Sequence, residues 1–330
     1  MSHVVLMSCE CPGIAPGLQK LGGSDVSFLL LSGGQSLSDR VAKCSIEERL
    51  ATIAIVSLLT DELGREQLSL LKSRLPNLQL IANYAVGYNN IDGSAAKELG
   101  IRVSNTPHVL GEATADLTLA LMLMVARRIW PGALEIHQQG RFAGWSPHYG
   151  LGVDLGGKTL GIVGWGDIGR RVEVRAQALG MKVVALESLR PIGQRSESVS
   201  RLPEREFLAA VDVLSLHCPL TPATRGWLNA LRVSALKKGA MVINTARGDV
   251  VDEQALAEAL RSGHLFGAGI DVFCGEPIVS PVLRGVPNLV ILPHLGSATI
   301  ETRSAMGKKV LENISALMRG QSLLPSQVHW

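Results

Sequence analysis

Short runs of apolar residues, separated by helix-like or turn-rich segments, open the chain. Continuous apolar runs of this length are typical of strands that are buried on both faces of a sheet. The predicted strands are Val4–Met7, Val26–Leu31, Thr52–Leu58, Leu78–Ala82 and Ile101–Ser104. A helix over Glu66–Leu75 ends before Pro76, because proline cannot continue a helix. This alternation predicts a parallel sheet with helices on both faces.

A second series of strands and helices begins at Thr159. Its strands are predicted over Thr159–Val163, Lys182–Leu186, Val211–Leu216, Ala240–Asn244, Gly267–Val272 and Leu289–Leu292. Helices are predicted over Asp167–Leu179 and over Glu253–Arg261, the second of which is ended by Gly263. The polar stretch 188–205 leaves the strand that should follow Glu187 unassigned.

Two further helices stand outside these series. The segment Glu112–Arg128 is apolar on most faces, which predicts burial in a core or in a subunit interface. The last segment, Thr299–Met318, has the pattern of an amphipathic helix. It could return to the first domain, which would make that domain discontinuous.

The composition supports two folded cores and excludes some partners. Hydrophobic residues make up 46% of the 330 residues, charged residues make up 18%, and the mean hydropathy is +0.23, so disorder is not expected. Lys and Arg number 32 against 29 Asp and Glu, a formal charge of +3. This excess is too small to indicate nucleic acid or an anionic membrane as the partner. Because no stretch approaches about 20 uninterrupted apolar residues, we expect no membrane span.

The cysteines suggest neither a disulfide framework nor a metal site. There are five, an odd number, and none has the spacing of metal ligands. We therefore expect no metal, and we expect small, reduced cysteines in a reducing compartment. The first residues, MSHVVLMSCECPG, lack the features of a signal peptide, which favours a cytoplasmic protein.

A glycine-rich turn, GWGDIG (164–169), follows the strand Thr159–Val163. The Gly-x-Gly-x-x-Gly motif alone is weak, but here a strand precedes it and a helix pattern follows it. An acid, Glu187, stands at the end of the next strand, close to the expected distance of about 20 residues. This context predicts a dinucleotide site. Glu187 would bind the ribose hydroxyls and repel a 2′-phosphate, which favours NAD over NADP. Arg190 is the one nearby residue that would favour NADP.

Each position of the motif has a physical role. Gly164 would permit the tight turn, Gly166 would let the backbone approach the pyrophosphate, and Gly169 would let the helix pack closely on the strand. The amides near Asp167 and Ile168 would lie at a helix N-terminus, where a phosphate binds favourably.

Three polar residues follow three later strands of the same series. They are Arg247 after Ala240–Asn244, Glu276 after Gly267–Val272, and His294 after Leu289–Leu292. In an open parallel sheet, ligands bind outside the carboxyl ends of the strands, so these side chains can reach one crevice.

Their chemistry suits the reduction of a 2-keto acid. Arg247 offers a planar, permanently charged fork for carboxylate and keto oxygens. His294 can give or take a proton near neutral pH. Glu276, if it is hydrogen-bonded to His294, would favour the protonated imidazole and fix its orientation. Each residue alone is commonly a surface or loop residue, but their joint placement favours a catalytic set.

Five segments carry a family resemblance. They are NYAVGYNNID (83–92), TLGIVGWGDIG (159–169), NTARGDVVDE (244–253), GIDVFCGEP (269–277) and ILPHLGSAT (291–299). With these segments the chain resembles the D-2-hydroxyacid dehydrogenase family, and within it the glyoxylate/hydroxypyruvate reductases, from about residue 53 to residue 325. The resemblance implies an NAD-dependent oxidoreductase with Arg247 as substrate anchor, Glu276 as partner acid and His294 as proton donor.

The resemblance also implies further contacts. The cofactor contacts are Pro219, Thr224, Thr245, Asp271 and Gly296. The substrate carboxylate would be held by the backbone amides of Val86 and Gly87. The segment 142–147 resembles one that places a tryptophan, here Trp145, at the active site of the neighbouring subunit, which implies a homodimer.

We expect an α/β fold of two doubly wound parallel-sheet domains. The Rossmann-type cofactor domain would span 105–295, and the flavodoxin-like substrate domain would consist of 1–104 and 296–330. The active site would lie in the interdomain cleft, with hinges near 105–107 and 295–297.

Other functions remain open. Relatives that act on D-lactate or phosphite share this fold, although Val86 leaves the substrate loop without a basic side chain. An NAD-sensing, corepressor-like binding protein could also keep the catalytic residues.

Overall fold

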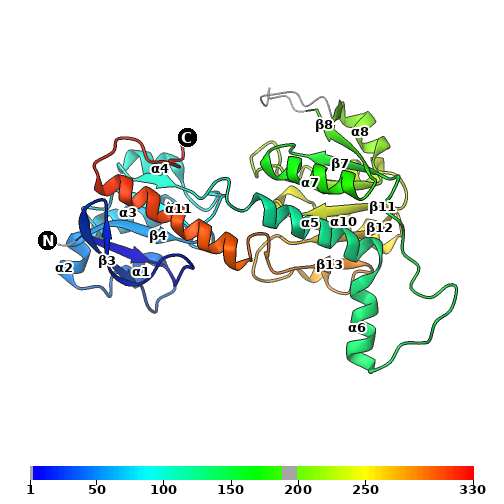
Figure 1. Ribbon diagram of the computed structural model, residues 1–330, viewed down its shortest axis with the longest axis horizontal. Helices are drawn as coiled ribbons and strands as arrows, with labels where there is room; N and C mark the ends of the chain where they lie inside the picture. The colour runs from blue at the N-terminus through cyan, green and yellow to red at the C-terminus, as the bar shows by residue number, and fades with distance from the viewer. Residues whose placement is uncertain (1–2, 188–198) are drawn as a thin grey trace. The chain divides into compact units, whose positions relative to one another are not determined.

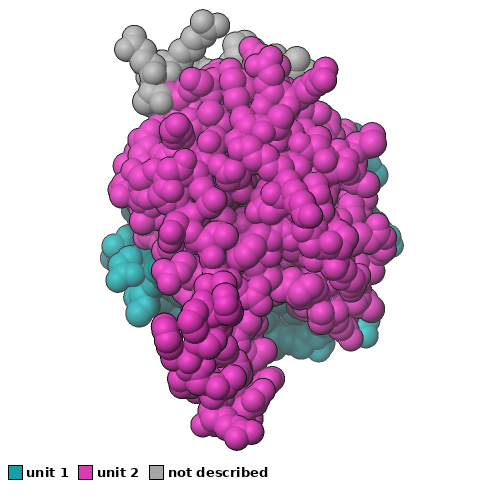
Figure 2. All heavy atoms as spheres, turned by 90° about the vertical axis from the view of Figure 1, so that its right-hand side faces the viewer, with its two compact units in different colours: residues 1–110, 298–330 teal, residues 111–297 magenta. Residues whose placement is uncertain are grey.

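The computed structural model describes residues 3–187 and 199–330. The chain divides into two compact units, 1–110 with 298–330 (unit 1) and 111–297 (unit 2) (Figure 2). The sequence prediction had placed these divisions at 104/105 and 295/296. Each unit has its own sheet and its own pair of hydrophobic clusters.

Unit 1 is built on a six-stranded sheet (Figure 1). Its strands are β1 (His3–Met7), β2 (Gly17–Leu21), β3 (Ser24–Leu30), β4 (Thr52–Ser57), β5 (Leu80–Asn83) and β6 (Arg102–Ser104). Its helices are α1 (Leu37–Val41), α2 (Ile46–Ala51), α3 (Arg65–Arg74), α4 (Gly93–Glu98) and α11 (Ile300–Met318). The strand order is β2-β3-β1-β4-β5-β6, and all pairs are parallel except β2 with β3. Without β2, this is the flavodoxin-like order 2-1-3-4-5.

The antiparallel edge strand β2 was not predicted, and it adds to the parallel sheet expected for unit 1. Strand β2 lies at the edge, and its residues are exposed or half-buried, so it has no buried apolar run to reveal it. Strands β1, β4 and β5 bury residues on both faces. Val4 and Leu6 pack with α1, α3 and α4, whereas Val5 and Met7 pack with α11, because successive strand residues point to opposite faces.

Unit 2 is built on a seven-stranded sheet. Its strands are β7 (Thr159–Val163), β8 (Lys182–Leu186), β9 (Ser200–Leu202), β10 (Val213–Leu216), β11 (Ala240–Asn244), β12 (Leu265–Ile270) and β13 (Leu289–Ile291). Its helices are α5 (Gly111–Ala126), α6 (Ile129–Gln139), α7 (Asp167–Ala178), α8 (Glu204–Ala210), α9 (Ala230–Ala235) and α10 (Glu253–Arg261), with 3₁₀ turns η1 (Gly248–Val250) and η2 (Pro281–Leu283).

All neighbouring strands of this second sheet are parallel, in the order β13-β12-β11-β10-β7-β8-β9. This is the 3-2-1-4-5-6 order of dinucleotide-binding sheets with one added strand. The direction of winding reverses between β7 and β10, and ligands bind beside such a switch point. Strand β9 is the one that the polar stretch after Glu187 left unassigned.

Helices cover both faces of this sheet (Figure 1). One hydrophobic cluster packs α8, α9 and α10 against the sheet, and the other packs α5 and α7. Leu121, Met122 and Val125 of α5 are fully buried in the second cluster. The apolar helix predicted over Glu112–Arg128 is therefore a core helix of unit 2, although Leu123 stays exposed.

Helix α6 and the segment that follows it form an arm that projects from unit 2 (Figures 1 and 2). No residue of α6 is buried. The exposed large apolar side chains of residues 129–151, here called the apolar arm, are Ile129, Trp130, Ile136, Phe142, Trp145, Tyr149 and Leu151.

Within the ranges that the structure describes, no single helix has the length and apolarity needed to cross a membrane. Helices α5 and α6 meet the length and composition criterion only when joined, and they are bent by 71°.

Candidate active site

The glycine-rich turn lies at the carboxyl end of β7 and leads into α7. Gly164 has φ +90°, and a Cβ there would lie 2.5 Å from the backbone nitrogen of Cys218 after β10. A Cβ at Gly169 would lie 2.6 Å from the carbonyl oxygen of Gly164. Both positions therefore need glycine, one for the turn and one for the packing of the helix on the turn.

Gly166 differs from the other two glycines, because a Cβ there would meet nothing within 4 Å. This residue is the N-cap of α7, and among the described residues no side chain caps the helix. The first amides of α7, at Asp167 and Ile168, lie at the positive end of the helix dipole, directly after this open N-cap. Such an end suits a pyrophosphate.

The expected ribose-binding acid lies at the end of the neighbouring strand. Glu187 follows β8, its side chain is exposed, and its backbone N–H donates to Leu202 of β9 at 2.9 Å. The open glycine turn and this exposed acid together fit an adenine dinucleotide. Arg190, the residue that argued for NADP, lies outside the described residues.

Trp165 of the glycine motif is buried beneath two arginines. Its Nε1 donates to Glu173 at 2.7 Å, and the guanidinium carbons of Arg170 and Arg201 lie 4.6 and 5.4 Å from the ring centroid. These contacts were not predicted. Arg170 and Glu173 follow closely in α7, whereas Arg201 comes from β9, the strand that the sequence left unassigned. Stacked cations stabilise the indole and hold the turn in place.

The predicted catalytic pair is hydrogen-bonded. Nδ1 of His294 lies 2.7 Å from Oε2 of Glu276, and the two side chains are 26% and 27% exposed. His294 follows β13 and has φ +56°, a left-handed conformation fixed by its N–H, which donates to the carbonyl of Asp271 at 2.9 Å. Glu276 follows β12, and its Oε1 accepts the N–H of Phe273 at 3.1 Å.

The carboxyl group of Glu276 remains ionised more readily than usual. Burial opposes its ionisation, but the hydrogen bond and charge of His294, the amide of Phe273 and the charge of Arg247 outweigh burial, so the pKa of Glu276 is lowered. A carboxylate is therefore available to hold a protonated imidazole.

Arg247 lies in the loop after β11, the strand next to β12. Burial lowers the pKa of Arg247 and the charge of Glu276 opposes this, but a guanidinium stays cationic. Asn244 holds the loop, since its Nδ2 donates to the carbonyl of Arg247 at 2.9 Å. A Cβ at Gly248 would lie 2.1 Å from the carbonyl carbon of Phe273, so glycine lets this loop approach the Glu276 loop. Asn244 and Gly248 were not predicted, although Asn244 stands in the quoted NTARGDVVDE segment.

Asp271 organises the backbone beside His294. Its carboxylate accepts the amides of Leu295 at 2.6 Å and Gly296 at 2.8 Å. Burial raises the pKa of Asp271, although these amides and His294 oppose the rise. In the structure this side chain therefore holds the 294–296 loop, and a contact with cofactor stays a prediction.

A half-buried histidine that the sequence did not single out lies at the end of β10. Nε2 of His217 lies 2.8 Å from Oγ of Ser215, and Nδ1 lies 3.4 Å from Oγ1 of Thr245. Thr245 contacts Thr118 of α5 at 3.0 Å. Burial lowers the pKa of His217 from 6.5 to about 4, so this imidazole is neutral at neutral pH and supports Thr245 through hydrogen bonds.

The remaining predicted residues lie in two loops. Oγ1 of Thr224 donates to the carbonyl of Pro219 at 2.6 Å and closes the turn after β10. In unit 1, Val86 and Gly87 follow β5, and their carbonyls accept from Asn105 and Asn83, each at 2.8 Å. Their amides donate to no group within residues 3–187 and 199–330. These amides are therefore available to an anion.

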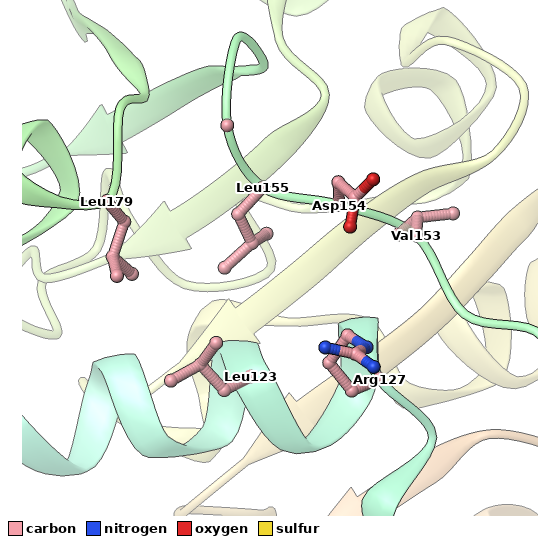
Figure 3. A pocket seen from close by; sticks show the side chains of 7 residues that line it. Leu123, Arg127, Val153, Asp154, Leu155 and Leu179 are labelled. Carbon is pink, nitrogen blue, oxygen red and sulfur yellow. The ribbon is translucent and has the colours of Figure 1, made fainter.

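Neither the hollow in unit 2 nor the distribution of possible metal ligands among the described residues points to a further centre. A hollow of about 500 Å³ is lined by Leu123, Arg127, Val153, Asp154, Leu155, Gly156 and Leu179 (Figure 3). The hollow lies before β7 and after α7, at the amino ends of the strands. The predicted site residues of unit 2 follow the carboxyl ends of the strands, at the opposite edge of the sheet. Across the described residues, no three His, Cys, Asp or Glu side chains gather as a metal site requires.

Comparisons with known proteins agree with this geometry. The family model for the D-isomer specific 2-hydroxyacid dehydrogenase, NAD binding domain, matches residues 119–296. The glyoxylate reductase of Korarchaeum cryptofilum is 42% identical over 271 residues, which cover 81% of this chain and 80% of that protein.

Solved structures extend the similarity to both units. A Thermus thermophilus protein is 39% identical with a TM-score of 0.83, over 99% of this chain and 100% of that one. An NADPH-dependent glyoxylate/hydroxypyruvate reductase of Sinorhizobium meliloti is 30% identical with a TM-score of 0.80, over 99% and 97%.

Proposed function

The chain belongs to the D-isomer specific 2-hydroxyacid dehydrogenases, and on that premise we propose that it reduces glyoxylate or hydroxypyruvate with NADH. The product would be glycolate from glyoxylate or the D-2-hydroxy acid from hydroxypyruvate. The chain is an oxidoreductase with an NAD-binding domain. The choice of substrate rests on the glyoxylate reductases that it resembles and on a set of groups suited to a small 2-keto acid.

The observation that carries the proposal is the His294–Glu276 hydrogen bond of 2.7 Å, in loops after adjacent strands. NADH, when bound at the glycine turn, supplies the hydride. His294 gives its proton to the oxygen of the substrate carbonyl, and Glu276 stabilises and orients the protonated imidazole. Arg247 binds the substrate carboxylate and holds the carbonyl in position.

The experiment offers the protein a panel of 2-keto acids together with NADH, and the rate of each reaction is measured from the loss of NADH absorbance. Glyoxylate, hydroxypyruvate, pyruvate and longer 2-keto acids are compared at equal concentration. We expect fast turnover of glyoxylate or hydroxypyruvate. Preference for pyruvate would favour a D-lactate-type enzyme, and NADH binding without turnover of any acid would favour a binding protein.

For the cofactor, we propose a preference for NADH over NADPH. The exposed carboxylate of Glu187 can accept both ribose hydroxyls and repels a 2′-phosphate. The Sinorhizobium meliloti relative is NADPH-dependent, so the panel is repeated with NADPH. Equal kcat/KM for both nucleotides would contradict this part of the proposal.

We also propose a homodimer, in which Trp145 reaches the substrate site of the other subunit. Trp145 is 84% exposed, and it lies among the other apolar side chains of the apolar arm. A single subunit would leave these side chains in water, whereas a second copy would bury them. Light scattering should give a dimer for the wild type, and Trp145→Ala should stay dimeric but bind substrate less tightly.

The proposed location is cytoplasmic. The five cysteines, Cys9, Cys11, Cys44, Cys218 and Cys274, are all free thiols. Proteins with free buried cysteines are typical of reducing compartments. Cell fractionation with antibody detection tests this, and recovery in the membrane or secreted fraction would contradict it.

A further inference from the structure

The first residue of α7 carries a negative charge at the place where the proposed function needs an anion. Asp167 lies directly after the open N-cap Gly166. A carboxylate at this end of a helix is favourable when the site is empty. It would repel the two phosphate groups of a dinucleotide, so the side chain has to be neutralised or directed away from the amides.

The structure shows what holds this carboxylate. Oδ1 of Asp167 accepts a hydrogen bond from Nε of Arg171, one turn later in α7, at 3.1 Å. Arg171 is itself fixed by an ion pair with Glu112 in the first turn of α5. Arg171 therefore pairs with two carboxylates at once, those of Asp167 and Glu112, in a partly exposed network.

Gly111, the first residue of α5, confirms that the carboxylate is directed toward α5. A Cβ at Gly111 would lie 2.6 Å from Oδ2 of Asp167 and 2.6 Å from Nε of Arg171. The ion pair therefore packs directly against the backbone of Gly111, and a larger residue there would have to displace the Asp167 and Arg171 side chains. This close approach is a second observation, independent of the hydrogen bond, that places the carboxylate at the start of α5.

We propose that Arg171 is a positioning residue for the cofactor, which neutralises Asp167 and holds it against α5 so that a pyrophosphate can bind the amides of α7. This inference rests on the proposed function, because it requires dinucleotide binding. Arg171 acts through Asp167 and need not touch the cofactor. Its removal would free a carboxylate beside the phosphates, and a charge pair several ångströms apart in partly solvated surroundings changes affinity about tenfold.

The helix offers a matched control. Arg175 lies one turn further along α7 and bonds to Asp116 at 2.6 Å and also to Glu112. It belongs to the same ion-pair network, but among the described residues its ion pairs are with Glu112 and Asp116 and not with Asp167. Arg171→Met and Arg175→Met both keep an unbranched side chain and a high helix propensity. The two substitutions should therefore change the stability of α7 by similar amounts.

The test measures NADH dissociation constants by titration calorimetry, without substrate and without turnover. Arg171→Met should weaken NADH binding about tenfold, and Arg175→Met less than about twofold. Adding Asp167→Asn to Arg171→Met should restore affinity to within about twofold of the wild type. The defect of Arg171→Met should also shrink at high salt, because salt screens the freed charge.

Three results would overturn the inference. They are an unchanged affinity in Arg171→Met, an equal loss in Arg175→Met, and a failure of Asp167→Asn to restore binding. If Arg171→Met does not fold, Arg171→Gln with and without Asp167→Asn makes the same comparison. Failure of the wild type to bind NADH would instead refute the proposed function, so the two failures are distinguishable.

Discussion

His217 makes the stability of unit 2 depend on pH in a calculable way. The unfolded chain takes up a proton on this residue below about pH 6.5, whereas in the folded chain burial lowers the pKa to about 4. Between these values the unfolded state binds more protons, so lowering the pH favours unfolding. From about pH 7 to about pH 5, this difference removes about 2 kcal/mol from the free energy of unfolding.

The matched variant is His217→Gln, which keeps an amide in place of Nε2 for Ser215 and has no proton to gain. Both proteins are unfolded in urea at several pH values, followed by tryptophan fluorescence. Carboxylates that titrate in both proteins cancel in the difference between them. The free energy of unfolding of the wild type, relative to that of the variant, should fall by about 2 kcal/mol as the pH is lowered across this range. Parallel pH dependences would refute the claim that the imidazole is buried in its neutral form.

Four other substitutions test the site. His294→Ala should lower kcat by about 100-fold or more, since the proton donor is lost, and leave the NADH dissociation constant unchanged; loss of NADH binding would contradict this role. Arg247→Ala should lower kcat and raise KM, about 100-fold together in kcat/KM, because the anchor also orients the carbonyl; wild-type efficiency on every 2-keto acid would refute it. Gly164→Ala should lower thermal stability by about 1–3 kcal/mol, because its φ of +90° and the nearby Cys218 backbone exclude a Cβ. Gly166→Ala, which has open space, should leave that stability unchanged.

The buried parallel strands were predictable because their apolar runs are continuous. All six strands predicted from Thr159 onward lie within two residues of strands in unit 2. Strands β2 and β9 were not assigned, since the first is a solvent-facing edge and the second is a three-residue polar strand. For such strands, pairing with a neighbour and not hydrophobicity decides the conformation.

The candidate site divides in the same way. Glycines, strand ends and reactive side chains are local features, so the sequence itself identifies Gly164, Arg247, Glu276 and His294. The supporting contacts are tertiary. His217 and Thr118 come from elements far apart in the sequence, and no local pattern places them near Thr245.

The discontinuity of unit 1 has a consequence for how the chain is made on the ribosome. Val5, Met7 and Phe28 lie on a sheet face that is covered by Met306, Val310 and Ile314 of α11. The strands emerge first and their cover emerges last, after the whole of unit 2. At about 5–20 residues per second, this apolar face stays uncovered for about 15–60 s while the residues of unit 2 are made. Unit 2 is one continuous segment, so it can fold as soon as its own last residues have emerged. We therefore expect chaperones to bind newly made chains at the uncovered sheet face of unit 1 and not at unit 2.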